Sequence, residues 1–370
     1  MKILTVFGTR PEVIKLAPVI TEIRKNSDKL ACSVCVTGQH RQMTQRLIEL
    51  FGIKIDYDLD IMAENQTLEH IAVSVLTRMK EIISREKPDF LMVQGDTSTA
   101  MAAALAAFYQ KVRVIHVEAG LRTSNKLQPY PEEVNRRIID SLSDLYFAHT
   151  ASAKDNLVRE GVPEENIEIT GNTVIDALLD VAGRDPDPGS FVPQHAPLNG
   201  EKIILVTAHR RESFGEPFRD ICYALKDIAS RYNNMRIIYP VHLNPNVQKP
   251  VREILGSMEN ISLVEPLDYL PFVHLMKRSY IILTDSGGVQ EEAPSLGIPV
   301  LVLRQTTERP EAVTAGTVEI IGTQREKIVS AASELIDNSD KYNRMSRAIN
   351  PYGDGKASQR IIARLLKENA

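Results

Sequence analysis

The sequence predicts an α/β protein built from two doubly wound, mostly parallel sheets. Short β-branched apolar runs alternate with longer amphipathic stretches along the chain, the pattern expected where helices connect parallel strands. The length of 370 residues exceeds what one hydrophobic core usually supports. A stretch rich in Pro, Gly and Asp at 183–200 interrupts the alternation. These observations predict two Rossmann-like domains that face a central cleft.

The first half alternates strands with helices. Strands are predicted at 2–7, 32–37, 90–94, 113–118, 144–148 and 166–170. Helices are predicted near 16–26, 41–51, 67–86, 97–109, 132–143 and 151–160. Because proline is favoured in the first turn of a helix and disfavoured in its interior, Pro18 predicts that the first helix begins near Leu16. Residues 9–12 would then form an irregular turn.

The second half repeats this pattern. Strands are predicted near 202–207, 235–239, 261–264, 280–284, 299–303 and 318–321, with helices in the gaps. Two further helices, at about 340–349 and 356–369, end the chain. Open sheets of this kind bind ligands at the carboxyl ends of their strands, so the residues that follow each strand are the first candidates for a site.

Composition narrows the class of function. A net charge of −4, with 5% aromatic residues and no Trp, argues against nucleic acid or an anionic membrane as a partner. No apolar run approaches the roughly 20 residues that cross a bilayer, and the N-terminus is typical of a first strand rather than a signal peptide. Three cysteines form no disulfide framework, which favours a reducing cytoplasm.

Cys32 and Cys35 have the C-x-x-C spacing of metal or redox sites. They lie in a predicted strand, where residues three apart point to opposite faces, and no second cysteine pair completes a zinc site. We interpret them as two strand cysteines.

A glycine turn follows the predicted strand at 280–284. Ser286, Gly287 and Gly288 connect that strand to a helix, and free N–H groups at such a helix start favour a phosphate or diphosphate. Glu292, about one turn further, would accept hydrogen bonds from a ribose diol. The alternative is a tight turn closed by glycines, with Glu292 as a solvated surface residue.

Charged and imidazole groups follow several other strands. They lie in the segments 8–12, 38–42, 94–99, 116–122, 207–212 and 240–245. Each has a structural alternative: Asp96 as a helix N-cap, Glu118 as the ion-pair partner of Arg122, and His209 or His242 as hydrogen-bonded loop histidines. Their recurrence at one strand end after another favours a polar cleft.

The residue types in this cleft indicate its chemistry. Cations suited to a diphosphate are Arg10, Lys15, Arg210, Arg211 and Arg309. Carboxylates suited to acid–base work are Asp96, Glu118, Glu132 and Glu133. No G-x-G-x-x-G or G-x-x-x-x-G-K-[ST] motif follows a strand, and no His/Cys cluster is present, so neither a nicotinamide cofactor, ATP nor a metal is indicated.

Long motifs occur in a fixed order along the chain. They are 6–12 (VFGTRPE), 95–97 (GDT), 116–122 (HVEAGLR), 131–133 (PEE), 171–173 (GNT), 207–212 (TAHRRE), 240–245 (PVHLNP), 284–288 (TDSGG), 290–297 (QEEAPSLG), 307–311 (TERPE) and 350–355 (NPYGDG). With these motifs the chain resembles the bacterial non-hydrolysing UDP-N-acetylglucosamine 2-epimerases over essentially its whole length.

The resemblance implies the GT-B fold and adjusts the domain boundary. In that fold the chain crosses near Gly171 and the last helix returns to the first domain. The N-terminal domain would comprise 1–170 and 357–370, and the UDP-binding domain 171–356. The implied activity is interconversion of UDP-GlcNAc and UDP-ManNAc without a cofactor, which supplies ManNAc for surface polysaccharides.

The mechanism implied by the resemblance is anti elimination of UDP. A base removes the C2 proton while UDP leaves C1, and UDP then re-adds to 2-acetamidoglucal with the proton delivered to the other face. Asp96, Glu118 and Glu132 carry over as the acid–base set, and which of them removes the C2 proton stays open. His209, Arg10 and the helix start at Ser286, Gly287 and Gly288 would stabilise the departing diphosphate. The resemblance also implies Lys15 and Arg136 as substrate-binding residues. Leu267 and Phe272 would lie beside the uracil, Glu292 at the ribose, and Arg309 near the sugar or diphosphate.

The family also implies a second UDP-GlcNAc that binds beside the substrate as an allosteric activator. The matching positions are Gln39, Gln42, Glu132, Arg210 and His242. One departure is that some relatives carry a basic residue just before Gln66, where this chain has Asn65. A homodimer is implied as well.

Three other functions compete with this one. A hydrolysing epimerase would release ManNAc and UDP from the same intermediate, and the matched allosteric positions argue against it. A GT-B glycosyltransferase would need an acceptor groove and usually a membrane-facing patch, of which the sequence has no sign. A sugar-nucleotide sensor would need no acid–base set.

Overall fold

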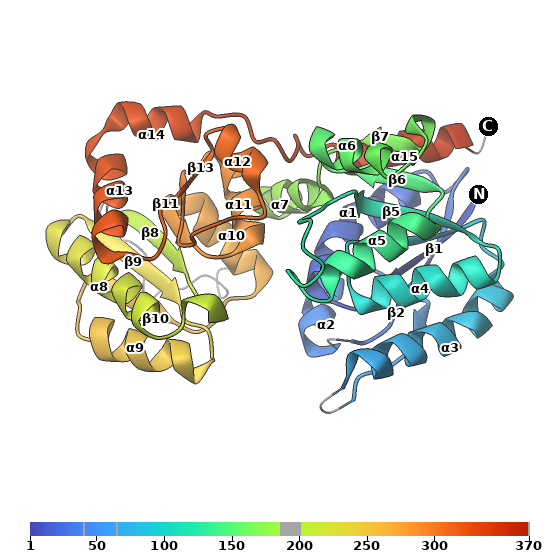
Figure 1. Cartoon of the computed structure of the whole chain (residues 1–370), viewed down its shortest axis with the longest axis horizontal. Helices are drawn as coiled ribbons and strands as arrows, with labels where there is room; N and C mark the ends of the chain where they lie inside the picture. Colours follow the sequence, from blue (N-terminus) through green and yellow to red (C-terminus); the bar gives the residue numbers. More distant parts are fainter. Residues whose placement is uncertain (40, 64–65, 186–200, 369–370) are drawn as a thin grey trace. The chain divides into compact units, whose positions relative to one another are not determined.

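The computed structural model describes residues 1–39, 41–63, 66–185 and 201–368, without the side chains of 41–43 (Figure 1). It divides into two compact units, which are Met1–Ala177 with Tyr352–Ala370, and Leu178–Pro351. The expected boundaries were 170/171 and 356/357, whereas this division falls at 177/178 and 351/352. The first division lies inside helix α7 (Thr173–Gly183), which continues from one unit into the other.

Unit 1 holds a seven-stranded parallel sheet in the order β3-β2-β1-β4-β5-β6-β7. Its strands are β1 (Lys2–Phe7), β2 (Ala31–Val36), β3 (Tyr57–Asp58), β4 (Phe90–Gln94), β5 (Arg113–Ala119), β6 (Leu145–Ala148) and β7 (Ile167–Ile169). Its helices are α1 (Arg10–Lys25), α2 (Arg41–Leu50), α3 (Leu68–Glu86), α4 (Ser98–Tyr109), α5 (Glu132–Leu142), α6 (Ala151–Arg159), the 3-10 turn η1 (Glu164–Asn166) and α15 (Ala357–Glu368). The strand order reverses between β1 and β4, so the crevice expected to bind ligand lies at the ends of these two strands.

Unit 2 holds a six-stranded parallel sheet in the order β10-β9-β8-β11-β12-β13. Its strands are β8 (Lys202–Thr207), β9 (Met235–Pro240), β10 (Ile261–Val264), β11 (Ser279–Thr284), β12 (Val300–Val302) and β13 (Val318–Ile320). Its helices are η3 (Arg211–Ser213), α8 (Glu216–Arg231), α9 (Pro245–Leu255), α10 (Tyr269–Arg278), α11 (Gly287–Glu292), η4 (Ala293–Leu296), α12 (Pro310–Thr314), α13 (Arg325–Asp337) and α14 (Ser339–Ser346). Here the order reverses between β8 and β11. The prediction of two doubly wound parallel-sheet domains is confirmed.

The predicted start of the first helix is wrong. Helix α1 begins at Arg10 rather than near Leu16, and Pro18 lies inside it. Glu12 explains the early start, because its carboxylate accepts the free N–H groups of Gly8 and Thr9. Burial of the apolar face of the helix offsets the hydrogen bond that a proline removes.

The last helix belongs to unit 1, since α15 packs against α1 (Figure 1). Its first turn is capped by Asp176 from α7. The Asp176 carboxylate accepts the N–H groups of Ala357 and Ser358 at 3.1 and 2.8 Å. The N–H of Asn172 donates to the carbonyl of Tyr352 at 2.6 Å. The segment after β7 and the segment before α15 are therefore joined directly.

Cys32 and Cys35 lie in strand β2, as predicted. Cys35 is buried, and burial raises the pKa of its thiol to about 12, which makes it a poor ligand or nucleophile at neutral pH. Among the described residues, no three His, Cys, Asp or Glu side chains are grouped so as to hold a metal ion.

Within the described ranges, no helix combines the length and the apolar character needed to cross a bilayer.

Candidate active site

Glu118 is the next-to-last residue of strand β5 and has a backbone φ of +69°, a conformation that is rare outside glycine. The pairing of β5 with β6 skips a residue there, so Glu118 occupies a bulge that re-aims its side chain. Its buried carboxylate accepts hydrogen bonds from Lys15 Nζ at 2.6 Å, Asn172 Nδ2 at 3.0 Å and Gln94. Lys15, expected at the substrate, is thus paired with Glu118. Three donors, one of them a cation, therefore fix the orientation of this carboxylate.

Arg122 is not the partner of Glu118, so the structural alternative for this glutamate is wrong. Arg122 donates to Asp140 at 2.7 Å and to Glu160 at 2.6 Å. Glu118 is therefore held by residues of other elements.

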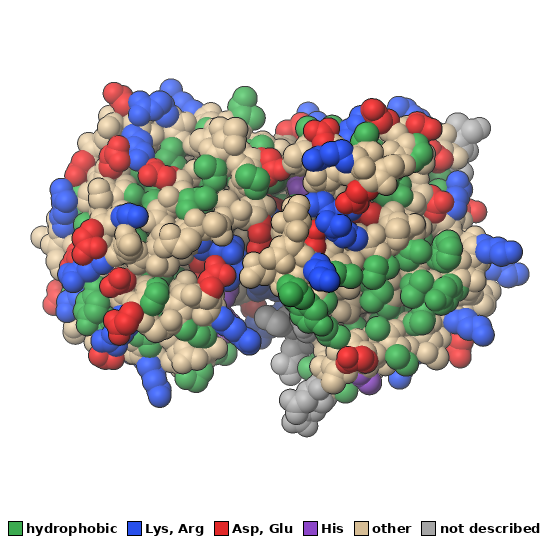
Figure 2. Space-filling view, viewed as in Figure 1, with side chains coloured by type: hydrophobic (Ala, Val, Ile, Leu, Met, Phe, Trp, Pro, Cys, Tyr) green, Lys and Arg blue, Asp and Glu red, His purple; other side chains and the backbone are tan. Residues whose placement is uncertain are grey.

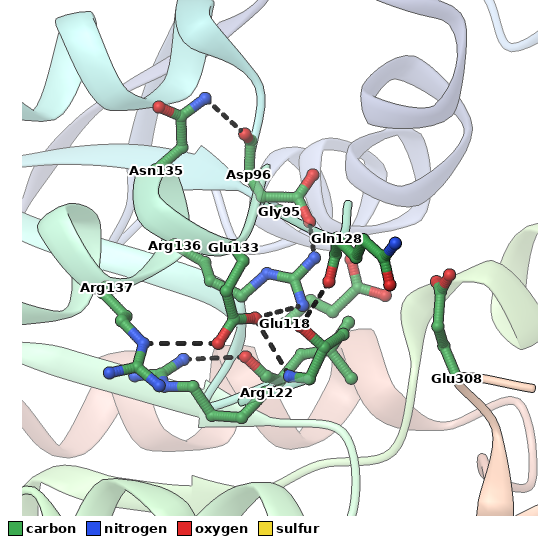
Figure 3. Close-up of polar contacts among 12 residues, drawn as sticks. Gly95, Asp96, Glu118, Arg122, Gln128, Glu133, Asn135, Arg136, Arg137 and Glu308 are labelled. Carbon is green, nitrogen blue, oxygen red and sulfur yellow. Dashed lines mark hydrogen bonds and ion pairs between the residues drawn. The ribbon is translucent and has the colours of Figure 1, made fainter. Parts of the chain in front are cut away.

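Asp96 follows strand β4, and its carboxylate accepts a hydrogen bond from Arg136 at 2.6 Å (Figure 3). Its carbonyl accepts from Asn135 Nδ2 at 2.9 Å. The N-cap interpretation of Asp96 is wrong, because Thr97 caps α4 by accepting the N–H of Ala100 at 2.9 Å. The Asp96 carboxylate is 26% exposed and thus accessible to a ligand.

Helix α5 supplies the partners of Asp96 and two further carboxylates. Arg136 also contacts Glu133, which is fully buried, at 3.3 Å (Figure 3). Glu132, the first residue of the helix, is half-buried. Arg10, the first residue of α1, is exposed at the end of β1.

Glu12 is a residue of this site that the sequence analysis did not single out. It is 1% exposed, and its two oxygens join the loop after β1 to the loop after β4. Oε2 accepts the N–H groups of Gly8 and Thr9, and Oε1 accepts the Thr97 hydroxyl at 2.7 Å. Burial raises its pKa, and these hydrogen bonds oppose the rise. The T-x-x-E spacing of a capping box was the signal that could have identified it.

In unit 2, Asp285 organises the loop after β8. Its carboxylate is fully buried and accepts the backbone N–H groups of His209 and Arg210 at 2.6 and 2.7 Å. His209 Nδ1 lies 3.4 Å from the same carboxylate. The imidazole of His209 stacks on that of His242, with ring centroids 5.3 Å apart. A candidate for the reaction and a candidate for the allosteric site are therefore in direct contact.

The predicted glycine turn forms the start of α11. A side chain at Gly287 would lie 3.8 Å from the Arg309 guanidinium, so this cation is next to the helix start. Arg309 also pairs with Glu291. Together, the N–H groups of a helix start and an adjacent guanidinium favour a bound anion.

Glu292 is not the solvated surface residue of the structural alternative. It is 9% exposed, and its carboxylate accepts the hydroxyl of Tyr269 at 3.1 Å. A side chain at Gly288 would meet Glu292 Oε1 at 3.3 Å, so glycine leaves room for this carboxylate. Leu267, before α10, and Phe272, within it, are half-buried.

The allosteric candidates Gln39 and Gln42 are in unit 1. The Gln39 side chain accepts the hydroxyl of Thr99 at 2.8 Å, and its carbonyl accepts from Gln66 at 2.9 Å. The side chain of Gln42 and the whole of Asn65 lie outside the described residues. Gln39 thus belongs to the strand-end crevice of unit 1.

Comparison with known proteins shows which family the chain resembles. Residues 21–366 match the family model described as UDP-N-acetylglucosamine 2-epimerase. The chain is 53% identical to the UDP-N-acetylglucosamine 2-epimerase of Salmonella typhimurium over 99% of this chain and 98% of that one. It is 52% identical to the protein of the same name from Campylobacter jejuni over 99% of this chain and 97% of that one.

Solved structures agree with these matches. The UDP-GlcNAc 2-epimerase of Neisseria meningitidis bound to UDP-GlcNAc superposes with a TM-score of 0.91 at 48% identity, over 99% of this chain and 100% of that one. The Methanocaldococcus jannaschii enzyme in complex with UDP-GlcNAc and UDP gives a TM-score of 0.80 at 34% identity, over 99% of this chain and 100% of that one. A glycotransferase of kitacinnamycin, at 13% identity and a TM-score of 0.65, shares the fold alone. The expected GT-B fold class is confirmed.

Proposed function

The chain belongs to the UDP-N-acetylglucosamine 2-epimerase family, and from that premise we propose that it interconverts UDP-GlcNAc and UDP-ManNAc without hydrolysing them. The observation that carries this proposal is the pair of carboxylates at the strand ends of unit 1. Asp96 and Glu118 each have a cationic partner at 2.6 Å, as acid–base groups held in a fixed geometry require. A protein that only binds a nucleotide sugar needs no such pair.

The groups of unit 2 would bind the nucleotide. The start of α11 with Arg309 suits the diphosphate, and Glu292 suits the ribose diol. Leu267 and Phe272 would contact the uracil. His209 would stabilise the negative charge that develops on the diphosphate as it leaves C1.

The groups of unit 1 would act on the sugar. One carboxylate of the set Asp96, Glu118 and Glu132 takes the C2 proton while the C1–O bond breaks, and UDP departs with the electron pair of that bond. The product of this step is 2-acetamidoglucal. UDP then adds back to C1 while a proton reaches C2 from the opposite face, which inverts C2 and leaves the nucleotide sugar intact.

Product analysis separates this function from its nearest alternative. Purified protein incubated with UDP-GlcNAc is expected to yield UDP-ManNAc, whereas a hydrolysing enzyme would release ManNAc and UDP. Glu118→Gln is expected to lose the activity. Glu253→Gln, the same chemical change at an exposed residue of α9, serves as the matched control and is expected to keep it.

Cleavage of the C1–O bond has its own test. UDP-GlcNAc labelled with ¹⁸O between C1 and the β-phosphorus is expected to scramble the label into the other β-phosphate oxygens. Label that stays in the bridging position while UDP-ManNAc forms would contradict the elimination.

Two further properties belong to the same proposal. A second UDP-GlcNAc would act as an activator, with contacts from Gln39, Gln42, Arg210 and His242. The stacking of His242 on His209 supports this role, because a ligand at one ring would affect the other. Initial rates that rise more steeply than the UDP-GlcNAc concentration are expected, and His242→Ala is expected to reduce that steepness. The enzyme would act in the cytoplasm, and its product would supply ManNAc units for surface polysaccharide.

A homodimer would cover an apolar surface of unit 1. Helix α4 is apolar on nearly every side, and its partly exposed Met101, Leu105 and Phe108 are spaced as one outer stripe. Phe108 and Val73 of the adjacent α3 are 55% and 64% exposed. Figure 2 shows hydrophobic side chains gathered over α4 and α3. Phe108→Glu is expected to shift the mass measured by light scattering from dimer to monomer.

A further inference from the structure

His116 is fully buried in strand β5, two residues before Glu118. Its Nδ1 lies 2.6 Å from Asp140 Oδ1, and its Nε2 lies 2.8 Å from the carbonyl oxygen of Gly95. Both distances are those of strong hydrogen bonds. The imidazole therefore connects a buried carboxylate to the peptide that immediately precedes Asp96.

The partners of His116 fix the orientation of its ring. A carbonyl oxygen only accepts hydrogen bonds, so Nε2 must carry a hydrogen. The other oxygen of Asp140 accepts Arg122 at 2.7 Å and the N–H of Gly120 at 3.3 Å. Burial raises the pKa of Asp140, but the charges and hydrogen bonds of His116 and Arg122 outweigh burial and lower it. Asp140 therefore holds the imidazole from the Nδ1 side, and the Gly95 carbonyl meets it from the Nε2 side.

We propose that His116 is a positioning residue, which fixes the Gly95 carbonyl and thereby the location of the Asp96 carboxylate. This inference rests on the proposed role of Asp96 in the reaction. Gly95 has a φ of +70°, and its N–H donates to the Val117 carbonyl at 3.0 Å. Asn135 holds the next carbonyl, that of Asp96 (Figure 3). Two successive carbonyls of the catalytic loop are thus each held by a buried side chain.

Two substitutions separate positioning from general stability. The amide nitrogen of glutamine can replace Nε2 and reach Gly95, whereas that of asparagine replaces Nδ1 and reaches only Asp140. His116→Asn is expected to lower kcat about 100-fold, since a displacement of about 1 Å at a reacting group costs that much. His116→Gln is expected to stay within about tenfold of the natural protein. UDP affinity should be unchanged in both, because neither touches unit 2.

Equal losses of kcat in the two variants, or a parallel loss of UDP affinity, would overturn the positioning role. Thermal unfolding of both variants checks that each is folded. If the natural protein has no epimerase activity, the proposed function fails, and the hydrogen bond from His116 to Gly95 is still tested by the next measurement.

Nitrogen NMR of the protein labelled with ¹⁵N-histidine tests the hydrogen bond to Gly95 without an activity assay. Because a carbonyl only accepts hydrogen bonds, one histidine is expected to carry a slowly exchanging hydrogen on Nε2, and its signal should be absent from His116→Gln. A pair of spectra in which no such Nε2–H signal is lost in His116→Gln would overturn the inference.

Discussion

Replacing Thr97 by valine is expected to lower the free energy of unfolding by about 2–4 kcal/mol. The single hydroxyl of Thr97 accepts the N–H of Ala100, which caps α4, and donates its proton to the buried Glu12. Loss of an N-cap costs about 1 kcal/mol, and loss of a hydrogen bond to a charged group about 1.5–3 kcal/mol. Valine has nearly the same shape, so the effect isolates the hydroxyl.

The size of this effect should depend on pH. Burial raises the pKa of Glu12, so folding favours its protonated form, and the stability associated with that proton is lost as pH rises through the folded pKa. Thr97 opposes the rise by donating to the ionised form. Urea unfolding at pH 4 and pH 8 is therefore expected to show a larger difference between the natural protein and Thr97→Val at pH 8.

Thr97→Ser is the matched control, because serine keeps both hydrogen bonds. It is expected to lie within about 1 kcal/mol of the natural protein. A valine variant as stable as the natural protein, or a serine variant as unstable as the valine one, would refute the role assigned to this hydroxyl. So would a difference that is larger at pH 4 than at pH 8.

Three other changes test separate parts of the account. Glu118→Gln is expected to reduce kcat by about 10²–10⁴-fold with UDP affinity preserved, and calorimetry that finds weaker UDP binding would assign Glu118 to binding instead. Tyr269→Phe removes one hydrogen bond to Glu292, worth about 1 kcal/mol, so KM should rise about fivefold at unchanged kcat. A lowered kcat with unchanged KM would argue against a ribose contact of Glu292. Asp176→Asn weakens the cap on the first turn of α15, so the free energy of unfolding should fall by about 1–2 kcal/mol in urea titrations. An unchanged value would show that Ser358 and its neighbours find other acceptors.

Much of the fold follows from the sequence because parallel strands are buried on both faces. Runs such as β4 and β11 are mostly apolar, and they are bounded by polar loops. Strand β3 has only two residues, too few for a periodic pattern, and it was not predicted. The start of α1 was misplaced because the rule for proline was applied to Pro18 without the capping signal of Glu12.

The site was predictable as a set of positions, whereas the pairing of its side chains was not. Glu118 lies at the end of β5 and Asp96 follows β4, and strand ends meet at one edge of a sheet, so their neighbourhood followed from topology. Their partners depend on backbone geometry that one sequence does not reveal. The positive φ of Glu118 directs it to Lys15 rather than to Arg122, which lies closer in the sequence.

The most direct test of the proposed reaction is proton NMR of UDP-GlcNAc incubated with the natural protein in D₂O. Loss of the C2 proton signal, together with the appearance of intact UDP-ManNAc deuterated at C2, is the result that elimination and re-addition predict. UDP-ManNAc that keeps its C2 proton would contradict proton removal at that carbon. UDP-GlcNAc that stays unchanged and free of deuterium would contradict the proposed function itself.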